Sequence, residues 1–210
     1  LILAPPKRLP DLIEATVLRA YDYGDQKTTE AKAPGPITVM TADPVAMTEK
    51  LSDRLAVAEG VFFTRDLVNA PANVLTTTAF AERLAEMEAL GLSVEVLEEE
   101  ALESLGMGAL LAVGQGSASP SKVVVMQWNG GGDEAPLALI GKGVVFDTGG
   151  ISIKPAAGME DMTMDMGGAG TVAGAMRALA LRKAKANVVG LVGLVENMPS
   201  GTAMRPGDVV

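Results

Sequence analysis

The sequence predicts an α/β fold, a three-layer sandwich built on a mostly parallel central sheet. Strand-like and helix-like stretches alternate along the chain, which is typical of βαβ architectures. The strand candidates are near-continuous apolar runs, as expected for a sheet covered on both faces. Three of them are "KVVVMQW" (122–128), "LALIGKGVVF" (137–146) and "NVVGLVGLV" (187–195). The 210 residues are enough for one substantial domain plus a fragment of another.

The first third of the chain reads mainly as helix. Apolar residues recur at helical spacing over 9–21, and a polar segment rich in proline and glycine at 24–36 predicts a loop. A short strand is expected at 37–42. Asp43 and Pro44 then make a good helix start, with an N-cap carboxylate followed by proline at the first helical position.

Later element boundaries are marked by proline, glycine and capping residues. Pro71 interrupts the long helix, Thr76 is a plausible N-cap for the next one, and Gly91 ends that helix after Leu90. The remaining expected elements are a half-buried strand at 92–97, a short helix at 98–106, a strand at 109–116 and a helix at 167–184. The glycines of that last helix predict close packing against a neighbour.

Composition removes several classes of chemistry. The chain has 26 acidic and 17 basic residues, and a net charge of −9 disfavours a nucleic-acid surface. It contains no cysteine and no histidine, so thiolate metal sites, Ser-His-Asp triads and histidine ligands are excluded. No uncharged apolar run reaches the about 18 residues of a membrane span. Any chemistry in this chain depends on carboxylates, lysines and backbone groups.

One segment gathers such groups, from Lys142 to Asp165. Asp147 falls where an apolar strand ends and is followed by Thr-Gly-Gly, which lets other backbone approach closely. Ligands of open α/β sheets bind beyond the carboxyl ends of strands. Asp161 and Asp165 lie four residues apart just before a helix, and Lys154 adds a second cation beside Lys142.

Two interpretations of this segment stay open from spacing alone. One is a solvated strand rim with structural ion pairs, and the other is a hard-cation site with carboxylate ligands. A bulge near Gly143 is needed to bring Lys142 and Asp147 to one face of the strand, because five residues is an odd spacing.

At these residues the chain resembles the leucyl aminopeptidase family, the two-metal exopeptidases of the cytosolic leucine aminopeptidase type. The motifs, in the family's order, are "VNAPANVLT", "LGMGALLAVGQGS", "GKGVVFDTGGISIKP", "DMGGAG", "ENMPSG" and "RPGD". The likeness runs from about Leu67 to the end of the chain. It favours the cation site over the solvated rim.

The resemblance implies a role for each matching residue. Lys142, Asp147 and Asp165 correspond to metal ligands, with Asp147 bridging two divalent ions, zinc or manganese, in each subunit. Lys154 corresponds to the lysine that polarises the scissile carbonyl without binding metal. Met162 corresponds to a residue lining the pocket for the first side chain of the substrate, and it is equally compatible with a core position.

The resemblance also implies an activity and its setting. The expected reaction is two-metal hydrolysis that releases N-terminal residues, leucine-like ones preferred, from short peptides. A cytoplasmic homohexamer is expected, with no membrane contact. The alternative is a non-catalytic scaffold or interaction relative that lacks part of the metal site.

Compared with the family, the chain is expected to be incomplete. The family continues after "RPGD" with a motif that supplies a further Asp, Glu and Arg, so these 210 residues alone are expected to be inactive. The expected division is 1–43 as the tail of an N-terminal α/β domain, 44–66 as a linking helix and 67–210 as the first part of the catalytic domain.

Overall fold

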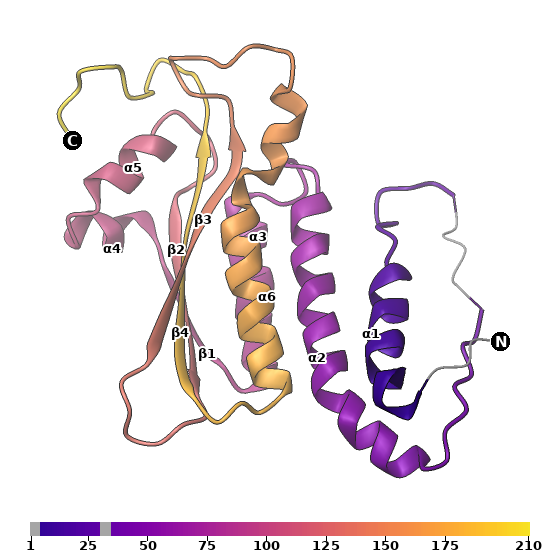
Figure 1. The fold of residues 1–210 in the computed structure, drawn as a ribbon. Helices are drawn as coiled ribbons and strands as arrows, with labels where there is room; N and C mark the ends of the chain where they lie inside the picture. The colour runs from indigo at the N-terminus through magenta and orange to yellow at the C-terminus, as the bar shows by residue number, and fades with distance from the viewer. Residues whose placement is uncertain (1–4, 30–34) are drawn as a thin grey trace.

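A computed structural model describes residues 5–29 and 35–210. A four-stranded sheet carries helices on both faces (Figure 1). Two further helices are stacked on the helical layer that covers one of these faces (Figure 1). The α-helices are α1 (Leu9–Arg19), α2 (Pro44–Asn69), α3 (Thr77–Ala85), α4 (Glu99–Ser104), α5 (Gly108–Gly114) and α6 (Gly167–Leu181). The strands are β1 (Ser93–Leu97), β2 (Lys122–Asn129), β3 (Leu137–Asp147) and β4 (Asn187–Asn197). Three 3₁₀ helices complete the set: η1 (Pro6–Arg8), η2 (Glu86–Leu90) and η3 (Met159–Met166).

The α/β class is confirmed, but the predicted mostly parallel sheet is wrong. The strand order is β1-β2-β4-β3; β1 and β2 run antiparallel, as do β2 and β4, and only β3 and β4 are parallel. The apolar strands reflect cover on both faces, α3 and α6 on one and α4 and α5 on the other (Figure 1). Burial of both sheet faces by helices does not determine whether neighbouring strands run parallel or antiparallel. Only the β3–α6–β4 connection is a crossover that returns a strand parallel to its predecessor.

Two predicted strands are absent from the described part of the chain. The apolar run at 109–116 forms helix α5 and packs on β4, since a short apolar run does not distinguish strand from helix. Residues 37–42 form no strand, because no neighbouring strand pairs with them and strand propensity depends on pairing.

The predicted helix boundaries follow their capping residues. The Asp43 carboxylate accepts a hydrogen bond from the Ala46 N–H at 3.0 Å, and Pro44 begins α2 as expected. The Thr76 hydroxyl accepts one from the Ala79 N–H at 3.2 Å. Gly91, in the left-handed conformation, ends η2. These local signals place the starts of both helices correctly, but the predicted helix up to Leu90 is α-helical only to Ala85 and continues as the 3₁₀ helix η2.

Helix α6 fits between the sheet and α2 because small residues face both neighbours. A Cβ on Gly60 of α2 would collide with the Gly174 carbonyl oxygen of α6 and lie 3.0 Å from the Ala178 Cβ. The Thr64 hydroxyl donates to the Gly170 carbonyl at 2.9 Å across the same crossing. The two backbones therefore lie closer together than larger side chains would allow.

Helix α1 packs on α2 through polar contacts as well as apolar ones. Arg54 forms ion pairs with Asp11 and Glu14. The Tyr21 hydroxyl donates to the Asp66 carboxylate at 2.8 Å, and its ring lies 5.3 Å from the Phe62 ring. Part of the predicted loop, 30–34, lies outside the described residues. The division of the chain at residues 43 and 66 stays a prediction; α2 itself continues to Asn69.

The described residues include no helix long and apolar enough to cross a membrane.

Replacing Gly60 with alanine should destabilise the protein. The added methyl meets backbone of α6 rather than a flexible side chain, so we expect the free energy of unfolding to fall by about 1–3 kcal/mol, as measured by urea denaturation. Gly167→Ala is the matched control, because a Cβ at this α6 position meets nothing within 4 Å. Equal stability of the two variants would contradict the close helix crossing.

Tyr21 should ionise well above the usual pH for a phenol. Burial, opposed by the hydrogen bond from Asn69 and reinforced by Asp66, raises the pKa of Tyr21 to about 12. Because the folded-state pKa is raised, the stability linked to this proton is complete below about pH 10 and is lost as pH rises towards 12. The absorbance at 295 nm of the protein minus that of the Tyr21→Phe variant should show a step near pH 12. In guanidinium chloride the step should return to about pH 10. A step near pH 10 in the folded protein would contradict the burial of Tyr21 against Asp66.

Candidate functional site

The candidate site lies where β3 ends. Register against β4 pairs Val144 with Val195 but Asp147 with Asn197, so β3 contains one extra residue between these pairs. The sequence predicts this bulge near Gly143. Lys142 pairs with Gly193, and an even spacing along β4 now separates the partners of Lys142 and Asp147. The bulge therefore places these two residues on the same face of the strand.

Asp147 is held by three donors on its two carboxylate oxygens. The Gly149 N–H donates to Oδ1 at 2.9 Å and Asn197 Nδ2 donates to the same oxygen at 2.8 Å. Lys154 Nζ donates to Oδ2 at 2.7 Å. Partial burial raises the pKa of the Asp147 carboxyl, but hydrogen bonds from Lys154, Gly149 and Asn197 outweigh burial and hold the pKa below its ordinary value. Asp147 is therefore an oriented carboxylate.

Met162 and Asp165 lie on one face of η3. Residues three apart superpose in a 3₁₀ helix, whereas residues four apart do not. Met162 Sδ lies 3.1 Å from Lys154 Nζ, which joins Met162 to the Asp147 cluster. Asp161, four residues from Asp165, is exposed on another face. The helical spacing that suggests a pair of aspartates thus does not bring them together.

Asp165 faces Lys142 across the gap between η3 and β3. The two side chains form an ion pair in which the lysine is largely exposed, with 57% of its side chain accessible, and the aspartate is not, with 22% accessible. Asp165 Oδ2 is buried and has no hydrogen-bond partner. A buried anionic oxygen without a donor is costly, which makes this oxygen a candidate for binding a cation.

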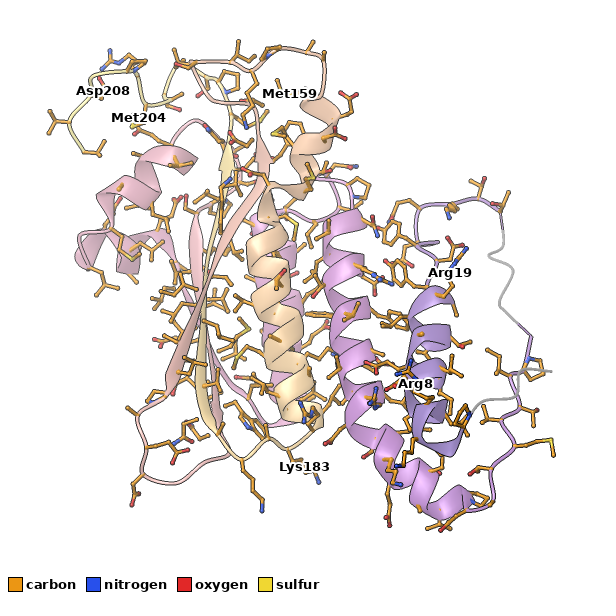
Figure 2. The ribbon with its side chains drawn as sticks, viewed as in Figure 1. Arg8, Arg19, Met159, Lys183, Met204 and Asp208 are labelled. Atoms are coloured by element: carbon orange, nitrogen blue, oxygen red, sulfur yellow. The ribbon has the colours of Figure 1, made fainter. Side chains whose placement is uncertain are left out.

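The five predicted site residues thus fall into two contact groups at one end of the sheet. Asp147, Lys154 and Met162 form one group, and Lys142 and Asp165 form the other. Met159, at the start of η3, lies at the end of the molecule opposite Lys183, which follows α6 (Figure 2). Residues 5–29 and 35–210 contain no cluster of three acidic side chains suited to a metal ion. A site here depends on lysine as well as carboxylate.

Asn197 is the polar contact that residue-by-residue reasoning missed. It lies fifty residues from Asp147 and ends an apolar strand, where nothing in the local pattern shows which side chain it meets. The only available signal was the motif "ENMPSG", which contains it.

The chain is similar in sequence to proteins of one family. Residues 62–210 match the catalytic domain of the cytosol aminopeptidase family. A probable cytosol aminopeptidase of Dinoroseobacter shibae is 70% identical over 203 residues, which cover 97% of this chain and 42% of the relative. One of Cereibacter sphaeroides is 66% identical over 205 residues, again 97% of this chain and 42% of the relative. The chain thus spans about 42% of the length of these curated relatives.

A solved structure has the same fold. The bottromycin maturation enzyme BotP in complex with Mn superposes with a TM-score of 0.84 at 39% identity, covering 97% of this chain and 43% of that one. With a family model matching residues 62–210 and a relative 70% identical over 203 residues, this chain belongs to the cytosol aminopeptidase family.

Proposed function

We propose that the protein containing this chain is a metal-dependent aminopeptidase. It would release N-terminal residues, leucine-like ones preferred, from short peptides by two-metal hydrolysis. The observation that carries the proposal is a pair of carboxylates, Asp147 at the end of β3 and Asp165 on η3, each held beside a lysine. Membership of the family supports the same reaction class.

The donor set fits divalent cations. The buried Oδ2 of Asp165 has no donor, and Asp147 presents Oδ2 to a cationic neighbour, so both carboxylates are arranged to meet positive charge. Lys142, Asp147 and Asp165 would hold the metal, with Lys142 binding as the neutral amine. That BotP was solved with Mn supports manganese, and zinc is the other candidate from the family resemblance.

Each residue then has a distinct task. Bound divalent ions supply Lewis-acid chemistry and lower the pKa of water. Lys154 keeps 36% of its side chain exposed, so its ammonium group can donate to a substrate carbonyl as negative charge develops there. Met162, in contact with Lys154, would line the pocket for the first side chain of the peptide.

Further parts of the proposal concern assembly, location and chain organisation. From the family resemblance we propose a cytoplasmic homohexamer and a catalytic domain that begins near residue 67. Edge strand β3 exposes Ile140 and Leu137, apolar side chains that further protein could cover. A purely scaffolding role has no use for a buried carboxylate oxygen without a donor, and this favours the enzyme over the scaffold.

Replacing Lys154 should impair turnover more than metal binding. In the whole protein we expect Lys154→Met to lower kcat about 100- to 1000-fold, because the donor to the developing oxyanion is lost. Leucine p-nitroanilide hydrolysis measures this, and Mn²⁺ titration should show that the ion still binds. Lys27→Met is the control, since Lys27 also pairs with an aspartate, Asp22, but at an exposed surface. A kcat within twofold of the unmodified protein would exclude the proposed role of Lys154.

Removing the metal should abolish the reaction reversibly. Treatment of the whole protein with a chelator is expected to stop hydrolysis, and added Mn²⁺ or Zn²⁺ should restore it. The Asp165→Asn variant should need a higher concentration of the ion for the same recovery, since an anionic ligand is lost. Full peptidase activity after verified metal depletion would be incompatible with the proposal.

A further inference from the structure

We infer that Asn197 is a positioning residue that fixes the carboxylate of Asp147, so that Oδ1 is held and Oδ2 faces the site. The inference rests on the proposed function, because Asp147 matters to catalysis only if it binds metal. Asn197 lies on β4, a different strand from Asp147, and Oδ2 is the Asp147 oxygen left facing the site.

The main chain of Asn197 is tied to the turn that follows Asp147. Asn197 ends β4 and is the register partner of Asp147 on the far side of the bulge. Its carbonyl oxygen accepts two hydrogen bonds from Thr148, one from the backbone N–H at 3.0 Å and one from the hydroxyl at 2.8 Å. Thr148 is buried. The position of Asn197 relative to the turn is thus set without its side chain.

The side chain of Asn197 then determines how Asp147 is oriented. Ionised carboxylates only accept hydrogen bonds, so the asparagine must present its NH₂ group to Asp147 Oδ1. The N–H of Gly149, in the turn that follows Asp147, donates to the same oxygen. Two donors on Oδ1 oppose rotation of the carboxylate, and Oδ2 is left for Lys154 or a cation.

The space around the amide favours asparagine in particular. Its own oxygen faces Gly150, where a Cβ would lie 2.8 Å away and where the backbone has φ of +67°. Glycine at position 150 therefore leaves room for the amide. An aspartate at 197 would place a carboxylate against the Asp147 carboxylate, and alanine would remove the donor. Both changes leave the Gly149 N–H to hold Oδ1 without the Asn197 amide, while the Thr148 bonds to the main chain remain.

Partners that orient a metal ligand typically change metal affinity about 10- to 100-fold when mutated. We therefore expect Asn197→Asp and Asn197→Ala, made in the whole protein, to weaken Mn²⁺ binding by that factor in calorimetric titration. Hydrogen exchange of the Gly149 amide should accelerate as well, because Asp147 Oδ1 is its acceptor. This second readout needs neither metal nor substrate.

Asn187→Asp is the matched control. Asn187 begins the same strand, and its amide donates to the carbonyls of Gly132 and Glu134 at 2.9 and 3.0 Å, so it also ties a loop to β4. Loss of that tie should lower the melting temperature without changing Mn²⁺ affinity or Gly149 exchange. A merely structural role for Asn197 predicts the same behaviour at both ends of the strand.

Several outcomes would overturn the inference. Folded Asn197 variants that bind Mn²⁺ within twofold of the unmodified protein would do so, as would unchanged Gly149 exchange. Failure of both Asn197 variants to fold would show a role in folding instead of positioning. If the unmodified protein neither binds Mn²⁺ nor hydrolyses peptides, the proposed function fails, and Gly149 exchange alone then decides whether Asn197 orients Asp147.

Discussion

The one-residue bulge in β3 is the constraint on which the candidate site depends. Without it, Lys142 and Asp147 would point to opposite faces, and Asp147 would not stand opposite Asn197. The bulge also ends the regular pairing of β3 with β4, so the chain turns at Thr148 and returns Lys154 towards Asp147. A local irregularity in a strand thus gathers groups that lie up to fifty residues apart in sequence.

Stability does not account for the charges gathered there. Exposed ion pairs contribute little to stability, about 0–1 kcal/mol, and Lys142 and Lys154 both keep much of their surface in solvent. Asp165 retains a buried oxygen that no protein group satisfies. Features that cost free energy without a structural return concentrate at functional sites. These costs support the proposal that the site binds an ionic ligand.

Local signals predict what depends on local interactions. Caps at Asp43 and Thr76 set helix starts, and the composition without histidine or cysteine directs attention to the lysines and carboxylates near Asp147. The predicted strand directions are wrong because they depend on where connections cross the sheet, not on how apolar a strand is. The same holds for α5, whose helical state is set by packing on β4.

Within the site, contacts inside one segment are predictable from the sequence and contacts between segments are not. Lys154 follows Asp147 closely, and both fall in one motif, so the sequence alone singles out this segment. Asn197 cannot be assigned in this way, because its partner is set by the register of β3 against β4. Nor does the sequence pattern indicate the 3₁₀ geometry of η3, which separates Asp161 from Asp165 while aligning Met162 with Asp165.

The glycines at the start of α6 connect the helix packing to the site. A Cβ on Gly141 of β3 would lie 2.7 Å from the Cα of Ala169, and one on Gly168 would lie 3.0 Å from the backbone nitrogen of Lys142. Helix and strand therefore touch backbone to backbone where α6 begins. Because η3 leads directly into α6, that contact also fixes the distance from Asp165 to Lys142. Larger side chains at these positions would push η3 away from β3 and separate the Lys142–Asp165 pair, so these glycines hold the candidate site together as well as allowing the packing.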